Sequence, residues 1–276
     1  MMTAEASAPL ASPVIPPLYY GETITYVHHW TDTLMSIRCT RNPAYRFDAG
    51  HFVMVGLMVE GEGGKHKPLV RAYSIASAPW DEELEFFSIK MQDGPLTSRL
   101  QHVKVGDTLL VGKKPTGTLV VQNLEPGGTL WLLGTGTGLA PFMSILRDPA
   151  TYERYDKIVL SHTVRRVADL AYREVIENLH LHELLGEVVG DKLVYYPGVT
   201  REPFPVNERI TNLVESGRIF RELNVPELHP SRDRVMLCGS EAMNADCKEM
   251  LERRGFVEGN TGERGTYVLE KAFVTK

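Results

Sequence analysis

The sequence pattern of the chain changes near residue 122, and this change limits the folds that it can adopt. Before that point, short runs rich in β-branched and aromatic residues recur at roughly ten-residue intervals, which is typical of an antiparallel barrel or sandwich. After it, compact apolar runs alternate with stretches of helical periodicity. Buried strands that alternate with helices predict a parallel sheet of α/β type.

The expected elements follow from these runs. The first part has one stretch of helical spacing, residues 94–103, where Leu96, Leu100 and Val103 fall on one face. Its expected strands are 22–30, 33–41, 51–60, 69–77, 84–91, 107–112 and 118–121. In the second part, the expected strands are 129–134, 157–162, 192–198, 234–240 and 264–270, and the clearest helical stretches are 166–179 and 241–255.

The length of 276 residues suits two domains. We expect an N-terminal antiparallel β barrel at residues 19–122 and a C-terminal α/β domain with a parallel sheet at residues 123–276. Residues 1–18 are rich in Ala and Pro and contain no Lys or Arg, so they resemble neither a signal peptide nor a transit peptide. We interpret them as a disordered arm.

Composition excludes several classes of protein. The net charge of −5 argues against a general nucleic-acid binder. The chain has three cysteines, Cys39, Cys238 and Cys247, with no paired short spacing, so neither a disulfide framework nor a metal or iron–sulfur site is expected. No apolar run approaches the ~20 residues that span a bilayer. The expected location is the cytoplasm, and the expected state is a monomer.

A glycine-rich turn follows the first apolar run of the second domain. Glycines stand at 134, 136 and 138, and a helix is expected to begin near Leu139. Glycines at a strand-to-helix turn let the backbone approach a ligand closely, and the helix N-terminus favours a phosphate. The dinucleotide fingerprint requires a small residue where this chain has Leu139. Taken alone, the segment is therefore a candidate phosphate loop or an ordinary strand–helix turn.

Residues 71–77 of the barrel, RAYSIAS, form an unusual strand. The alternation of a strand sends Arg71 and Tyr73 to the same side of the sheet. A guanidinium can hold a pyrophosphate through two hydrogen bonds, and a tyrosine can cover a flat ring. The alternative is a surface ion pair beside a packed tyrosine. The histidines His28, His29, His51 and His162 lie on apolar strands, where we interpret them as structural.

The two segments together resemble the ferredoxin–NADP reductases of bacteria. The resemblance rests on R-x-Y-S in the barrel, then G-T-G-T-G-x-A-P and LCGS in the α/β domain, and it runs from about residue 20 to the end of the chain. The segments 28–34, 84–90, 94–102, 114–120 and the ending KAFVTK also match this group. Their order and length make chance a poor explanation, and the resemblance implies a flavoprotein that uses FAD and NADP.

The resemblance implies a role for each matching residue in the flavin site. Arg71 would bind the FAD pyrophosphate, Tyr73 would stack on the flavin ring, and the Ser74 hydroxyl would lie near flavin N5. Cys238 would lie where nicotinamide and flavin meet, and Ala272, in place of a terminal aromatic residue, would lie beside the flavin, so both count with Ser74 as catalytic. Further FAD contacts are expected at Ala72, Ser88, Ile89, Lys90, Leu96, Thr97, Ser98 and Phe273.

NADP rather than NAD is favoured by charge. NAD sites place an acidic residue after the second strand, whereas NADP sites offer Arg, and this chain has Arg165 and Arg166 there. Arg201 and Arg209 follow the third strand, and the resemblance implies that Arg165, Arg201 and Arg209 surround the 2′-phosphate. The alternative is that they are solvated surface charges. The other NADP contacts are expected at Gly136, Thr137, Gly138, Cys238 and Gly239.

The predicted activity is reversible electron transfer, through FAD, between NADPH and a one-electron carrier protein. The chain has no cluster cysteines, so the carrier is expected to be a separate acidic protein, ferredoxin or flavodoxin, steered by a basic rim. Candidates for that rim are Lys104, Lys113, Lys114 and Lys276. Two alternatives remain: an NAD(P)H-dependent flavin reductase subunit that serves an oxygenase or a ferric chelate, and a non-catalytic nucleotide-binding or sensory flavoprotein.

Overall fold

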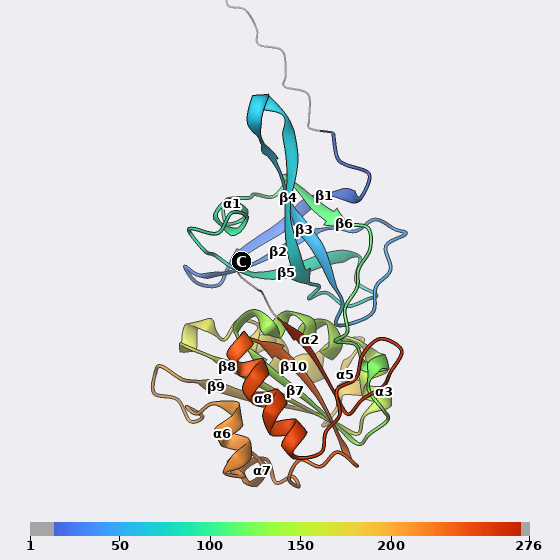
Figure 1. Ribbon diagram of the computed structural model, residues 1–276, viewed down its shortest axis with the longest axis vertical. Coiled ribbons are helices and arrows are strands. Elements are labelled where there is room, and N and C mark those ends of the chain that lie inside the picture. Colours follow the sequence, from blue (N-terminus) through green and yellow to red (C-terminus); the bar gives the residue numbers. More distant parts are fainter. Residues whose placement is uncertain (1–13, 272–276) are drawn as a thin grey trace, which may run out of the picture.

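The computed structural model describes residues 14–271 and has two parts, which lie one above the other in Figure 1. The upper part is an antiparallel barrel and the lower part is a parallel sheet with helices on both faces. This is the predicted fold class. The predicted boundary between residues 122 and 123 falls between the last strand of the barrel and the first strand of the parallel sheet. Residues 1–13 of the predicted arm lie outside the described residues.

The barrel is one antiparallel sheet with the strand order β4-β3-β6-β1-β2-β5. A bridge between Ile75, just after β4, and Phe86 in β5 joins the two outer strands and closes the sheet. Leu96, Leu100 and Val103 are all buried, as their spacing predicts. The elements are β1 (Tyr19–His29), β2 (Leu34–Thr40), β3 (Phe52–Glu60), η1 (Glu62–Gly64), β4 (His66–Ser74), β5 (Glu83–Ile89), α1 (Thr97–Leu100) and β6 (Thr108–Gly112).

The second sheet is parallel throughout, with the order β11-β10-β7-β8-β9. Its elements are η2 (Val121–Asn123), β7 (Thr129–Thr135), η3 (Gly136–Gly138), α2 (Leu139–Leu146), α3 (Pro149–Arg154), β8 (Lys157–Val164), η4 (Val167–Asp169), α4 (Arg173–Glu177), η5 (Leu179–Leu181), α5 (Gly186–Val189), β9 (Leu193–Val199), α6 (Ile210–Glu215), α7 (Arg218–Leu223), β10 (Asp233–Gly239), α8 (Glu241–Arg253) and β11 (Tyr267–Lys271). Among the described residues, every helix is too short or too polar to span a bilayer.

Alternation along β7 gives each face of this sheet its own core. Leu130 and Leu132 pack with α2 to α5 on one face, whereas Trp131 and Leu133 pack with α6, α7 and α8 on the other. The first of these two cores also contains side chains of the barrel, namely Leu34, Ala49, Ala76 and Phe87. A continuous apolar core therefore joins the barrel to the face of the sheet that α2 covers.

The predicted strand at residues 118–121 is wrong. These residues form a bend that leads into η2, and they pair with no strand in the described part of the chain. Leu119 and Val121 are nevertheless buried, in the core that joins the two domains. A segment that lines such a junction must be buried, as a central strand must, so the two have the same apolar composition. The segment at the junction nevertheless makes no ladder of hydrogen bonds.

The predicted helix at 166–179 is interrupted. It consists of η4, a turn and then α4, and Tyr172 precedes α4 with a left-handed φ of 61°. This backbone conformation is uncommon for residues other than glycine. The side chain of Tyr172 is buried against the barrel, and these contacts hold the residue where its backbone cannot continue a helix.

Candidate active site

The glycine-rich turn connects β7 to α2 through η3. Gly136 has a φ of 54°, a conformation that glycine adopts readily. A Cβ on Gly138 would lie 2.1 Å from the carbonyl oxygen of Cys238. The turn therefore crosses the carboxyl end of β10 at a distance that only glycine permits. The N-terminus of α2 follows the turn directly, and a helix N-terminus favours a phosphate.

Two side chains hold the turn in place. The Thr135 hydroxyl accepts a hydrogen bond from the backbone N–H of Ser240, at 3.1 Å, and so ties the end of β7 to the start of α8. His162 lies on β8, and its Nε2 is 3.0 Å from the carbonyl oxygen of Gly136. Burial lowers the pKa of His162 to about 4, so the ring is neutral near pH 7 and donates from Nε2. His162 thus supports the turn structurally.

Cys238 is fully buried at the carboxyl end of β10, beside Gly134 of β7 and Glu270 of β11. Burial, with a smaller contribution from Glu270, raises the pKa of the thiol well above its usual value. A protonated, buried thiol is a poor nucleophile. Cys238 therefore contributes shape and packing at this end of the sheet.

A carboxyl group that the sequence reasoning missed joins the two domains at the same place. The Ser74 hydroxyl, at the end of β4, donates a hydrogen bond of 2.8 Å to Oε1 of Glu270, on β11. Oε2 of Glu270 is inaccessible to solvent and has no hydrogen-bond partner among residues 14–271. Burial raises the pKa of Glu270 to about 7, and the Ser74 hydrogen bond opposes this rise. The pair can hold or release a proton near neutral pH.

Replacing Glu270 with glutamine should make the protein less sensitive to rising pH. The folded state holds the Glu270 proton with a pKa of about 7 instead of 4.5, so its contribution to stability is full below pH 4.5 and is lost as the pH rises through 7. The whole difference corresponds to roughly 3 kcal/mol. Denaturant unfolding at pH 5 to 9 should show Glu270→Gln gaining stability over the parent as the pH rises.

The exposed Glu263, which makes no ion pair with a described residue, provides the matched control. Glu263→Gln should differ from the parent by the same amount at every pH. In Ser74→Ala, the loss of stability should occur at a higher pH than in the parent, because the substitution removes the hydrogen bond that lowers the pKa of Glu270. A Glu270→Gln difference that stays constant from pH 5 to 9 would contradict the raised pKa.

The predicted flavin contacts that the structure describes lie on or next to β4, β5 and α1 of the barrel. Tyr73 is buried, and its hydroxyl lies 3.1 Å from Oγ of Ser88 on β5. Arg71 is exposed on β4. The Leu96 side chain is in the barrel core, so it can reach a cofactor only through its backbone. Of the remaining predicted residues, Ala72 is exposed, and Ile89, Lys90, Thr97 and Ser98 are partly buried. Ala272 and Phe273 lie outside the described residues.

The three predicted arginines of the nucleotide site are exposed at the same edge of the sheet as the glycine turn. The backbone N–H of Arg201 donates to the carbonyl of Arg165 at 3.0 Å, which places these two residues side by side. Arg209 lies just before the first turn of α6. No described residue forms an ion pair or a side-chain hydrogen bond with the three guanidinium groups. They are therefore available to a ligand.

Comparison with known proteins agrees with this geometry. Residues 132–249 match the oxidoreductase NAD-binding domain family. Ferredoxin–NADP reductase A of Sorangium cellulosum is 60% identical over 93% of this chain and 91% of its own length. The chain belongs to the ferredoxin–NADP reductase family.

Other members of the ferredoxin–NADP reductase family match along nearly the whole chain. The flavodoxin/ferredoxin–NADP reductase of Rhodobacter capsulatus is 51% identical over 92% of this chain and 93% of its own length. A ferredoxin NADP⁺ reductase from Neisseria gonorrhoeae, whose crystal structure contains FAD and NADP, superposes with a TM-score of 0.83 at 31% identity. That match covers 94% of this chain and all of the other.

The sequence reasoning missed functional candidates that share one feature. Glu270 ends an apolar strand, and Glu85 lies inside another, LEFFSIK. A carboxylate within an otherwise buried strand is rarely tolerated without a partner. That rule can identify such residues, although it cannot identify their partners, which lie far away in the sequence.

Proposed function

We propose that the protein binds FAD against the barrel and NADP at the carboxyl edge of the parallel sheet, and transfers electrons between NADPH and ferredoxin. One observation carries the proposal. The glycine turn, Cys238 and the Ser74–Glu270 pair meet at one place, where a barrel strand touches the end of the sheet. A site of this kind can hold a nucleotide and a second flat ring in contact.

The residues present fit both groups. Gly138 packs the turn directly against β10, and a Cβ on Gly136 would meet nothing within 4 Å, so the turn has open space for a nucleotide at Gly136. The exposed guanidinium groups of Arg165, Arg201 and Arg209, which pair with no residue of 14–271, suit the 2′-phosphate. When bound, the flavin accepts two electrons from the nicotinamide and passes them on singly. Ser74 and Glu270 would supply a proton to the bound flavin or accept one from it.

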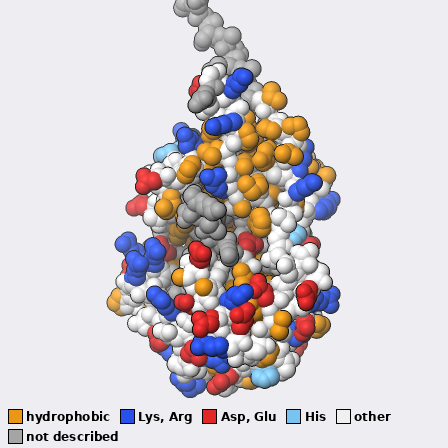
Figure 2. All heavy atoms as spheres, in the orientation of Figure 1, with side chains coloured by type: hydrophobic (Ala, Val, Ile, Leu, Met, Phe, Trp, Pro, Cys, Tyr) orange, Lys and Arg blue, Asp and Glu red, His pale blue; other side chains and the backbone are white. Residues whose placement is uncertain are grey.

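The carrier protein belongs to the same proposal. The relatives at 51–60% identity are named for ferredoxin, and the one from Rhodobacter capsulatus is also named for flavodoxin. Figure 2 shows hydrophobic side chains gathered on the barrel half of the face in view. Lys104, Lys113 and Lys114 are exposed on the barrel, so their charges are available to an acidic carrier. Lys276 lies outside the described residues. Flavodoxin as a carrier, the monomeric state and a cytoplasmic location remain predictions.

The purified protein should be yellow with non-covalent FAD, and NADPH should bleach it in the absence of oxygen. Adding ferredoxin should then restore the yellow colour in proportion to the ferredoxin reduced. The measurement is the visible spectrum before NADPH, after it, and after the carrier, with flavodoxin tested in the same way.

Three results separate this function from its alternatives. A flavin reductase subunit would reduce free flavin or ferric chelates faster than ferredoxin. A sensory flavoprotein would bind FAD but would oxidise NADPH negligibly. A colourless protein that cannot be reconstituted with FAD would overturn the proposal altogether.

A further inference from the structure

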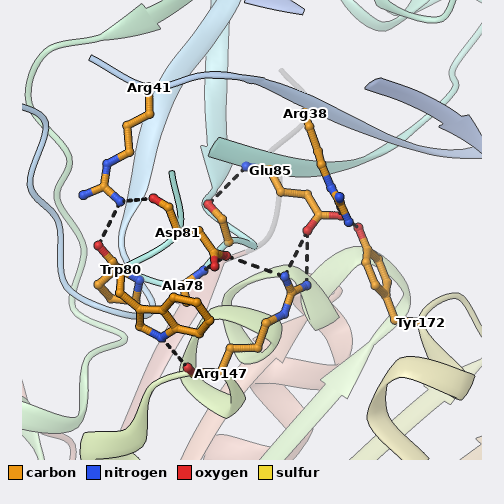
Figure 3. Close-up of polar contacts among 10 residues, drawn as sticks. Arg38, Arg41, Ala78, Trp80, Asp81, Glu85, Arg147 and Tyr172 are labelled. Carbon is orange, nitrogen blue, oxygen red and sulfur yellow. Dashed lines mark hydrogen bonds and ion pairs between the residues drawn. The ribbon is translucent and has the colours of Figure 1, made fainter. Parts of the chain in front are cut away.

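A buried carboxylate of the barrel binds two separate segments of the α/β domain (Figure 3). Glu85, on β5, is 3% exposed. Its Oε2 accepts hydrogen bonds from Nη1 and Nη2 of Arg147, each at 3.2 Å. Its Oε1 accepts a hydrogen bond of 2.9 Å from the Tyr172 hydroxyl. We call Glu85, Arg147 and Tyr172 the interdomain clamp.

The clamp is largely buried, and neighbouring residues of the barrel make further contacts with it. The side chains of Arg147 and Glu85 are 13% and 4% exposed, so solvent screens their attraction little. The Tyr172 ring packs edge-on against Phe87, with 5.3 Å between centroids. Additional contacts are Tyr172–Ser36 at 2.5 Å, Trp30–Ser36 at 2.7 Å, Trp80 to the Arg147 carbonyl at 2.9 Å, Arg147–Asp81 at 3.8 Å and Arg38–Glu85 at 3.6 Å.

Arg147, one of the two partners of Glu85, lies on a segment whose position matters to the coenzyme site. Arg147 follows α2 directly, and α2 begins at the glycine turn, so one short rigid helix of about 12 Å connects the clamp to the turn. Tyr172 is held in its left-handed conformation while it reaches the barrel. A non-glycine residue keeps such a conformation only where its surroundings enforce it.

Glu85 also lies on the strand that carries part of the proposed flavin site. It lies three positions before Ser88 on β5, and the hydroxyl of Ser88 contacts Tyr73. A single strand therefore carries both the clamp and part of the proposed flavin site. A fixed connection runs from the glycine turn through α2, Arg147 and Glu85 to this strand.

We infer that the interdomain clamp is a positioning device that sets the distance between the nicotinamide and the flavin. This inference rests on the proposed function. The rate of hydride transfer falls steeply as the distance between the two rings increases, and a displacement of about 1 Å can lower the rate a hundredfold. The 2′-phosphate arginines follow β8 and β9 and precede α6, and no contact among the described residues joins their side chains to the clamp. Loosening the clamp should therefore slow hydride transfer and leave coenzyme affinity largely unchanged.

The test compares Tyr172→Phe and Glu85→Gln with the parent, as FAD-loaded proteins. Anaerobic stopped-flow measurement of flavin reduction by NADPH should give a rate about tenfold lower for Tyr172→Phe and about a hundredfold lower for Glu85→Gln. FAD content and the Kd for NADP⁺ should stay within about twofold. Hydrogen–deuterium exchange should rise in the peptides that contain Arg147 and Tyr172. Tyr172→Phe removes one hydroxyl and so tests the inference even if Glu85→Gln fails to fold.

The α/β domain offers a matched control. The Tyr196 hydroxyl donates to Glu222, which also binds Arg218, so a Tyr–Glu–Arg group of the same chemistry lies within one domain. Tyr196→Phe and Glu222→Gln should leave the rate of flavin reduction unchanged. If the controls slow it as much as the clamp variants do, or if the clamp variants keep the parent rate, the inference is overturned.

Failure of the proposed function can be recognised separately. If NADPH does not reduce the parent, the proposed function is wrong, and hydrogen–deuterium exchange still tests whether the clamp fixes the two domains. Unchanged exchange in Tyr172→Phe and Glu85→Gln would then overturn the clamp as well.

Discussion

Replacing Arg201 and Arg209 together with alanine should lower the preference for NADPH over NADH by about one to three orders of magnitude. The two coenzymes differ only at the 2′-phosphate. The exposed guanidinium groups near that edge of the sheet make no ion pair with a described residue. A hydrogen bond to a charged group contributes roughly 1.5–3 kcal/mol, and about 1.4 kcal/mol is a factor of ten. Exposure to solvent and salt brings the total toward the lower end.

The decisive quantity is kcat/KM for both coenzymes in the parent and in the double variant. The loss with NADPH should appear in KM, because the phosphate is remote from the reacting ring, and it should shrink as ionic strength rises. Arg253 and Arg254, which pair with Glu215 on the same domain, supply the control. Replacing both with alanine should leave the ratio unchanged. Equal losses of kcat/KM with NADPH and NADH in the Arg201/Arg209 variant would show that these arginines do not bind the 2′-phosphate.

The sequence predicted the fold because each domain has its own periodicity. The ten-residue spacing of the barrel strands and the strand–helix alternation after residue 129 are local signals, and both survive in the structure. The predictions failed at the junction between the domains. Val121 is buried in a segment with no strand partner, and Tyr172 interrupts a helix to reach β5. In both places, tertiary contacts override local pattern.

The candidate site also has residues that the sequence predicts and residues that it does not. The glycine turn and the arginines at strand ends belong to short motifs, which can be recognised directly in the sequence. Glu270 acquires its raised pKa from burial, and the hydrogen bond that opposes the rise comes from Ser74, which is 196 residues away in the chain. Glu85 and Tyr172 are likewise 87 residues apart. Such pairs depend on how the two domains dock, and the docking of the domains cannot be predicted from the periodicity of the sequence.

Gly138→Ala should lower NADPH affinity by about a hundredfold or more. An added Cβ would lie 2.1 Å from the carbonyl oxygen and 2.6 Å from the carbonyl carbon of Cys238. Both atoms belong to the backbone of a central strand, so they cannot move aside as a flexible side chain would. The turn must therefore shift by about 1 Å or more, and such a shift removes the alignment of its N–H groups with a phosphate. The measurement is the Kd for NADP⁺, with the melting temperature recorded alongside.

The same substitution at Gly128 is the control for Gly138→Ala, because Gly128 lies just before the opposite end of β7. A Cβ there would be 3.8 Å from its nearest neighbour, Oδ2 of Asp156, which is an ordinary contact. Gly128→Ala should keep both the coenzyme affinity and the FAD of the parent. Gly138→Ala should also keep its FAD, since the barrel carries that site, and this separates a displaced turn from a collapsed protein. If Gly138→Ala binds NADP⁺ as tightly as the parent, the glycine turn is not the coenzyme cradle, and the nucleotide must lie elsewhere on the sheet edge.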